Sequence, residues 1–277
     1  MPANEPRQSR ATLAPGLASH AAVRKVLDTC AEDFARHHVR VMRSDDPEGP
    51  HGARVALRRL RTALGAFRPF LRRRPRRAVA AEARALFRLL GEVRDADVLA
   101  LTAADGETAE VLAQEAGKAR AHVRAELVER SAKEFAGRVG ELTEGKRWWR
   151  RSARRRAALP IEAPAADALD GAWDAARSYG TQVAHMDTES RHGFRKELKA
   201  LRYLTDFFAP LWPGRRQRRF LKRLKRLQEA LGTLNDLAVA EARLGEEGRA
   251  ERARQAEQAL AAAEQDWRRL RRMRRWW

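Results

Sequence analysis

Apolar residues recur every three or four positions along almost the whole chain after Leu17, and this spacing is typical of one face of an α-helix. Strand-like alternation of useful length does not occur. The pattern therefore predicts an all-α protein. The expected helices cover residues 17–43, 51–70, 76–103, 107–140, 167–187, 191–210, 214–243 and 246–275. We expect a break near Gly91, because glycine weakens a helix interior.

The helical pattern lapses at two places. Residues 1–16 are polar and contain prolines, which favours a disordered lead. The stretch "EGKRWWRRSARRRAALPIEAPAAD" contains two prolines and a dense basic run, which favours a linker over 144–166. These lapses predict a first helical bundle over 17–143 and a second over 167–277, the second ending in the basic, tryptophan-containing tail "RRLRRMRRWW".

A comparison of the chain with itself shows an internal repeat. A shift of 141 residues places "HGARVALRRLR", from His51, on "HGFRKELKALR", from His192. The same shift places "LGEVRDADV" on "LGTLNDLAV" without a gap. The period is too long for a solenoid repeat. We therefore expect two four-helix bundles, related by a pseudo-two-fold axis and enclosing a central basic channel or groove.

The repeated helix has an apolar side and a cationic side. On a helical wheel at about 100° per residue, the cationic residues of each copy fall within about 80°. We call them the first ladder (His51, Arg54, Arg58 and Arg61) and the second ladder (His192, Arg195, Lys199 and Arg202). An ordinary solvated helix face mixes both signs of charge, whereas neither ladder contains an acid. Arginine binds phosphate oxygens in pairs through its planar fork, so the ladders are candidates for binding a polyanion.

Composition limits the function classes. The net charge of +20 favours a polyanionic partner, although an Arg- and Ala-rich composition makes the total charge weak evidence by itself. Cys30 is the only cysteine, so an internal disulfide is excluded and a reducing, cytoplasmic location is expected. No apolar run approaches the roughly 18 residues that cross a bilayer, so we expect no membrane partner.

The histidines and nearby acids allow several interpretations. His51 and His192 could hydrogen-bond to the preceding loop, contact phosphate or bind a metal. The acids that precede them, in the spacing Asp–x–Glu–x–x–His, are explained more simply by helix capping, and no second His or Cys stands at zinc-ligand spacing. Asp95 and Asp236 could be catalytic acids. We favour structural roles for them, each pairing with a cation of the repeated helix.

These two motifs, each present twice, in order and at equal spacing, resemble the halves of a CHAD domain, the conserved histidine α-helical domain, over residues 17–270. The resemblance implies two four-helix bundles around a basic channel, binding of inorganic polyphosphate and, in some members, association with polyphosphate granules. By position it implies the two ladders as binding residues, with Arg84 and Lys225 as a second tier. Gly52 and Gly193 depart from the family, where bulkier residues are common, and are expected to loosen that turn.

Three functions are compatible with the sequence. The first is non-catalytic binding of inorganic polyphosphate, with no cofactor and no metal. The second is nucleic-acid binding, because tryptophans interleaved with arginines can stack on unpaired bases. The third is metal-dependent phosphoanhydride hydrolysis by Asp95, Asp97 and Asp236. The Glu–x–Glu–x–Lys mark of the CYTH-type triphosphatases that accompany many relatives does not occur in this chain, and we expect no enzymatic activity. The oligomeric state stays open.

Overall fold

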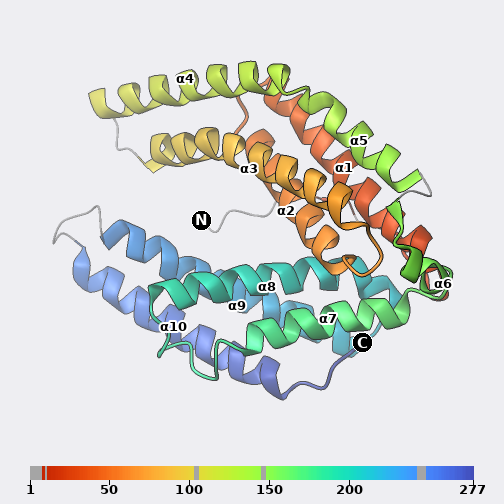
Figure 1. Ribbon diagram of the computed structural model, residues 1–277. Coiled ribbons are helices and arrows are strands. Elements are labelled where there is room, and N and C mark those ends of the chain that lie inside the picture. The colour runs from red at the N-terminus through yellow and green to blue at the C-terminus, as the bar shows by residue number, and fades with distance from the viewer. Residues whose placement is uncertain (1–7, 10, 103–105, 145–147, 242–247) are drawn as a thin grey trace. The chain divides into compact units, whose positions relative to one another are not determined.

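The computed structural model describes residues 8–9, 11–102, 106–144, 148–241 and 248–277, and these residues are predominantly helical (Figure 1). Over this part of the chain, strand-type pairing is limited to two isolated bridges, Ala18 with Pro160 and Leu71 with Trp149. The all-α prediction is therefore confirmed. The helices are α1 (Ser19–Arg43), α2 (Glu48–Ala66), α3 (Arg73–Thr102), α4 (Glu107–Glu129), α5 (Ala132–Glu144), η2 (Arg151–Ala153), α6 (Arg154–Ala157), α7 (Glu162–Arg177), α8 (Thr188–Phe208), η3 (Ala209–Leu211), α9 (Arg215–Glu241) and α10 (Arg249–Arg272).

The described residues divide into two compact units, with the boundary between Ile161 and Glu162. In the first unit, α1 packs against α2 and α5, α2 packs against α3, and α3 packs against α4. In the second unit, α7 packs against α8, α8 against α9, and α9 against α10. Figure 1 shows these helices in the colour order of the chain.

The repeat extends to the helix boundaries. A shift of 141 residues carries α2 to 189–207, where α8 covers Thr188–Phe208. The same shift carries α3 to 214–243, where α9 covers Arg215–Glu241, and α4 to 248–270, where α10 covers Arg249–Arg272. The chain therefore contains the same run of helices twice.

The structure corrects three helix predictions. The helix expected over 167–187 ends at Arg177, and residues 178–187 form turns and irregular structure. The expected helix over 107–140 is divided at Ser131, whose φ of 49° lies in the left-handed region that side chains other than glycine rarely adopt. The expected break near Gly91 is wrong, because α3 continues through Gly91 and α9 continues through Gly232. Intrahelical hydrogen bonds and packing outweigh the propensity cost of about 1 kcal/mol that a single glycine carries.

The described part of the expected lead over 1–16 is not disordered. Ala11 and Leu13 are buried, at 1% and 3% exposure. The Ser9 amide donates to both carboxylate oxygens of Asp33, at 3.1 and 2.9 Å. Arg59 donates to Asp33 Oδ2 and to the Ser9 carbonyl, both at 3.0 Å. The segment therefore completes a buried ion pair between α1 and α2, which a polar composition alone does not reveal. Residues 1–7 and 10 of this lead lie outside the described residues.

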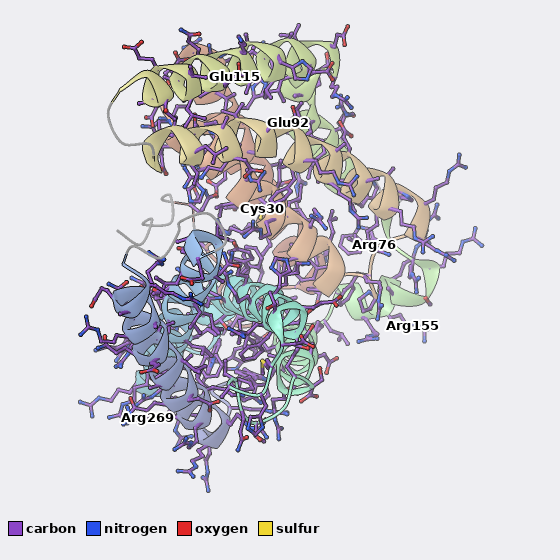
Figure 2. All side chains as sticks on the ribbon, turned by 90° about the vertical axis from the view of Figure 1, so that its left-hand side faces the viewer. Cys30, Arg76, Glu92, Glu115, Arg155 and Arg269 are labelled. Atoms are coloured by element: carbon purple, nitrogen blue, oxygen red, sulfur yellow. The ribbon has the colours of Figure 1, made fainter. Side chains whose placement is uncertain are left out.

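Around this ion pair, burial raises the pKa of the Cys30 thiol to about 12, so the single cysteine remains protonated inside the first unit (Figure 2). A buried, protonated thiol packs as a small apolar side chain.

The expected linker over 144–166 is largely packed rather than free, although its residues 145–147 lie outside the described part. Trp148 is 4% exposed, and its carbonyl accepts a hydrogen bond from the Arg72 amide at 2.7 Å. Further along, the Ser19 amide and hydroxyl both donate to the Leu159 carbonyl, each at 2.8 Å. This segment therefore belongs to the first unit as far as Ile161.

The tryptophan-containing tail also packs inward. Trp276 is buried and lies against Trp212 and Phe220, with ring centroids 6.0 and 6.5 Å apart. Trp277 Nε1 donates to Asp170 Oδ1 at 2.6 Å, so the tail is fixed to α7. Within the described ranges, no helix is long and apolar enough to cross a bilayer.

Candidate functional site

The sequence assigned the two sides of the repeated helix correctly. Leu57, Leu60 and Leu64 are completely buried, as are Leu198 and Leu201 of the second copy. The ladder cations are instead partly exposed, and His192 is exposed. Each ladder therefore lies on the outward side of a helix whose other side belongs to the core of its unit.

Asp187 is the N-cap of α8, as expected, whereas the N-cap of α2 is Pro47, one residue after Asp46. Asp187 Oδ1 accepts a hydrogen bond from the Ser190 amide at 2.7 Å, and this hydrogen bond lowers the pKa of the Asp187 carboxyl. Asp46 Oδ1 accepts from the Glu48 amide at 2.8 Å, and Asp46 Oδ2 lies 2.5 Å from Arg40 Nη2. Both acids therefore accept hydrogen bonds from the first turn of a repeated helix. This role explains why the two repeats share the spacing between acid and histidine.

The glycines that follow the histidines allow close packing of a ring. A Cβ on Gly52 would lie 2.2 Å from two ring atoms of His37, and a Cβ on Gly193 would lie 2.3 Å from the Tyr179 hydroxyl oxygen. Gly52 lies inside α2 and Gly193 inside α8, so another side chain can approach each helix closely, and loosening of the turn stays a prediction. His37, which approaches Gly52, belongs to α1, and Tyr179, which approaches Gly193, belongs to the turn after α7.

Arg54 of the first ladder is held against α3. Its Nη1 donates to the Phe87 carbonyl at 3.1 Å, and its Cζ lies 4.2 Å from the centroid of the Phe87 ring. A Cβ on Gly91 would lie 2.2 Å from the same Nη1, so Gly91 provides the space in which the guanidinium lies. Burial lowers the pKa of Arg54, and Asp95 opposes this effect.

Further arginines gather beside it between α2 and α3. Arg58 Cζ lies 5.2 Å from the Phe87 ring centroid, within the range of a cation–π contact. Burial lowers the pKa of Arg61, and the like charges of Arg84, Arg58 and Arg88 lower it further. We call the resulting set the first cationic face: His51, Arg54, Arg58, Arg61, Arg84, Arg88 and Arg94. Arg84, which the repeat and the family resemblance gave as a second-tier binding residue, therefore lies near the first ladder.

Three members of this region were not among the predicted residues. Phe87, Arg88 and Arg94 correspond under the repeat to Gln228, Glu229 and Asn235, so a search for repeated residues passes over them. Arg88 could have been found as the residue one helical turn beyond Arg84. The role of Phe87 depends on the packing of α3 against α2 and has no comparable sequence signal.

The second cationic face, on α8 and α9, comprises His192, Arg195, Lys199, Arg202 and Lys225 and contains more acid. Arg202 lies 3.8 Å from Asp206 Oδ2 and donates to Gln228 Oε1 at 3.3 Å. Lys225 Nζ lies 3.6 Å from Glu229 Oε1. Partial desolvation lowers the pKa of the exposed His192, and the charges of Lys196, Arg195 and Lys199 lower it further. This face is therefore cationic but partly neutralised.

Comparison with known families decides the assignment of this fold. The sequence model of the CHAD domain matches residues 25–245. The chain belongs to the CHAD domain family. The two cationic faces and their repeated motifs lie within the matched residues.

Solved structures agree with the family at the level of the fold. The CHAD domain is similar to a crystal structure of the CHAD domain from the plant Ricinus communis, with a TM-score of 0.71, 24% identity and 97% of each chain covered. It is also similar to PptA from Streptomyces chartreusis, with a TM-score of 0.54 and 16% identity over 91% of this chain and 99% of that one. Comparison with curated proteins gave no match.

The repeat-associated acids of this CHAD domain have different surroundings. Asp97 is 2% exposed and pairs with Arg120, so it joins α3 to α4. Asp95 is exposed and acts electrostatically on Arg54. Asp236 is exposed and accepts from Asn235 Nδ2 at 3.4 Å. Among the described residues, no group of three or more His, Cys, Asp or Glu side chains could hold a metal ion.

Proposed function

We propose that this CHAD domain binds inorganic polyphosphate without catalysis, through its two cationic faces. The observation that carries the proposal is the gathering of like charges on the first face, where Arg58, Arg84 and Arg88 all lower the pKa of Arg61. Such repulsion is unfavourable in the empty protein, and a polyanion relieves it. The family resemblance adds polyphosphate as the chemical class.

The local geometry suits phosphate oxygens. Guanidinium groups donate in parallel pairs, and the contacts of Arg54 and Arg58 with the Phe87 ring restrict their orientation. Ladder rungs on one helix recur every one to two turns, or roughly 5 to 10 Å. A flexible chain of linked phosphates can therefore contact several rungs at once.

The second face supports the same chemistry with fewer uncompensated charges. The resemblance further predicts that both ladders line one basic channel across a pseudo-two-fold axis, and that the protein associates with polyphosphate granules in the cytoplasm. The shared channel and the association with granules stay predictions of the resemblance.

Packing of the tryptophans weakens the alternative of nucleic-acid binding. That alternative depended on indole rings available to stack on bases, but Trp148 and Trp276 are buried. Hydrolysis is also less well supported, because Asp97 is engaged with Arg120 between two helices. We therefore propose a binding protein rather than an enzyme.

Salt-dependent titration tests the function. By analogy with nucleic acids, neutralising roughly 6 to 10 phosphates lowers affinity about 10³- to 10⁵-fold between 50 and 200 mM salt. We expect long-chain polyphosphate to follow this dependence and to bind more tightly than short duplex DNA at every salt concentration. Equal or tighter binding of the DNA would contradict the proposal.

A second measurement tests the absence of catalysis. We expect no phosphate release from polyphosphate in the presence of Mg²⁺ or Mn²⁺. Release that is lost in the folded variants Asp95→Ala and Asp236→Ala would instead show an enzyme that uses those acids.

A further inference from the structure

The N-terminal end of α3 is packed against the segment that follows α5. The Arg72 amide donates to the Trp148 carbonyl at 2.7 Å, and the Arg150 amide donates to the Phe70 carbonyl at 2.9 Å. Leu71 and Trp149 form a bridge between these two hydrogen bonds. Residues 148–150 are therefore fixed by backbone pairing to residues 70–72, immediately before α3, within the first unit.

This pairing gathers arginines from three parts of the sequence. Burial lowers the pKa of Arg76, and four neighbouring guanidinium groups lower it further. We call these five residues the α3-start cluster: Arg68, Arg73, Arg76, Arg77 and Arg150. Figure 2 shows Arg76 at the same end of the first unit as Arg155, which belongs to the basic run of α6.

The hydrogen bonding of Arg76 is incomplete. Its Nε is buried, and over the described ranges it has no hydrogen-bond acceptor. The other four members of the cluster are exposed to solvent. Arg76 as a whole is partly exposed, and its positive charge among four like charges is unfavourable unless an anion compensates it.

An exposed row of arginines joins this cluster to the first cationic face. Arg73, Arg77, Arg84 and Arg88 fall within about 60° on the wheel of α3. All four are exposed, and Arg88 lies 15 helical steps beyond Arg73, or roughly 22 Å at 1.5 Å per step. Arg84 and Arg88 are the two members that act on Arg61 of the first ladder.

The aromatic residues near the cluster favour phosphates over nucleic-acid bases. Trp148 is buried, and Trp149 packs edge-on against Phe70 with ring centroids 6.4 Å apart. Arg156 also contacts the Phe70 ring, with its Cζ 5.9 Å from the ring centroid. These rings support the arginines by packing, and stacking on a base would require the indoles to leave their places.

We propose that the α3-start cluster is a second phosphate-binding site, continuous with the first cationic face along α3, which holds the extension of a long polyphosphate chain. The inference rests on the proposed function and adds a dependence on chain length to it. Tripolyphosphate is too short to occupy both ends of the arginine row. A long chain occupies both, and its second contact forms at high effective concentration.

Three exposed arginines provide the test variant, Arg73→Gln combined with Arg77→Gln and Arg150→Gln. A matched control removes the same charge from surface ion pairs on α1 and α4 through Arg24→Gln, Lys118→Gln and Arg130→Gln. Such exposed pairs contribute little to stability, so both triple variants should fold, and circular dichroism verifies this. Each protein is titrated with tripolyphosphate, with long-chain polyphosphate and with single-stranded DNA.

We expect the test variant to lose about 10- to 100-fold in affinity for long-chain polyphosphate at low salt, and to keep nearly all of its affinity for tripolyphosphate. The control should lose a smaller amount, equal for both ligands, because only net charge has changed. Equal losses for the two ligands in the test variant would overturn the inference. If the test variant loses affinity for single-stranded DNA but keeps its affinity for long-chain polyphosphate, the cluster is a nucleic-acid site instead. A native protein that binds neither polyphosphate would instead refute the proposed function.

Discussion

Gly91 and Gly232 occupy equivalent positions in the two repeats, yet only one of them makes room for another side chain. A Cβ on Gly91 would lie 2.2 Å from Arg54 Nη1, whereas a Cβ on Gly232 would meet nothing within 4 Å. The first repeat therefore uses its glycine to place a guanidinium group, and the second repeat uses its glycine for no such contact.

The two glycines provide a matched pair of substitutions. Gly232→Ala should stabilise the protein by roughly 0.4–1 kcal/mol, because alanine is the better helix former and the added methyl group has space. Gly91→Ala should stabilise the protein less than Gly232→Ala does. It should also weaken polyphosphate binding, because the Arg54 guanidinium must leave the Phe87 carbonyl. Urea unfolding and polyphosphate titration measure both effects. Identical behaviour of the two variants would contradict this role for Gly91.

At the same scale, His192 gives binding a dependence on pH. Partial desolvation, followed by Lys196, Arg195 and Lys199, lowers its pKa, so the imidazole of the free protein is neutral at pH 7. A polyanion favours the protonated form. Binding should therefore strengthen as pH falls below about 6.5, with uptake of protons.

Titrations between pH 5 and 8 measure this effect in the native protein, in His192→Gln and in His185→Gln, the last being an exposed control histidine of the same unit. The dependence should persist in the control and diminish in His192→Gln. Parallel profiles for all three proteins would assign His192 a purely structural role.

Among the elements, the pairs α2–α3 and α8–α9 share a sequence pattern but differ in charge balance. Arg88 of the first pair corresponds to Glu229, which lies 3.6 Å from Lys225. Gly65 corresponds to Asp206, which lies 3.8 Å from Arg202. The first face therefore has more positive charge to offer a polyanion than the second.

This difference predicts unequal losses from equivalent substitutions. Arg58→Gln with Arg61→Gln should weaken polyphosphate binding roughly tenfold more than Lys199→Gln with Arg202→Gln. The four positions correspond in pairs under the repeat, so each variant removes two charges from the same helix positions. Calorimetric titration of the two variants gives the comparison. Equal losses would show that the acids of the second face have no effect on its binding.

The sequence was sufficient to predict which segments are helices and which side of the repeated helix is buried. It was not sufficient to predict which side chains pair between neighbouring helices. The apolar positions of the repeated helix, such as Leu57 and Leu198, are buried as predicted because burial dominates the energetics of an amphipathic helix. Arg59 corresponds to Ala200 in the repeat and was not among the predicted site residues. It is 3% exposed and paired with Asp33. Such a pair depends on which helices pack together, and periodicity within one helix does not report this.

The candidate site was predictable to the same degree. The repeat located the ladders and Arg84, because duplication retained cations at those positions. It passed over Phe87 and the α3-start cluster, whose members come from separate stretches and meet where residues 148–150 pair with residues 70–72. Where the family resemblance and the repeat agree, they identify one helix face well. They do not identify what a neighbouring segment adds to it.

For the molecule as a whole, the net charge of +20 opposes folding of the empty protein. The exposed arginines of the α3-start cluster and of the first cationic face concentrate this charge in the first unit. Salt therefore acts in opposite directions on stability and on binding, because it screens the repulsion within the protein as well as the attraction to polyphosphate.

Without ligand, the melting temperature should rise by a few degrees between about 20 and 300 mM sodium chloride. Scanning calorimetry over this range measures the change, and the two compact units can give separate transitions. Over the same salt range, the affinity for polyphosphate should fall. A melting temperature that decreases with salt would show that attractive ion pairs, rather than repulsion, dominate the surface.

The packing of α10 determines how short a fragment can be cut and still fold. The CHAD match over residues 25–245 begins inside α1 and stops before α10. In α10, Trp267 is completely buried, and Asp266 lies 3.1 Å from both Arg223 and Arg226 of α9. A fragment limited to residues 25–245 would lack α10 and would expose to water the apolar side of α9 that α10 covers. We expect such a fragment to aggregate in inclusion bodies on expression. The residues that match the family model are therefore fewer than the residues that must fold together. Fragments for expression should include α10.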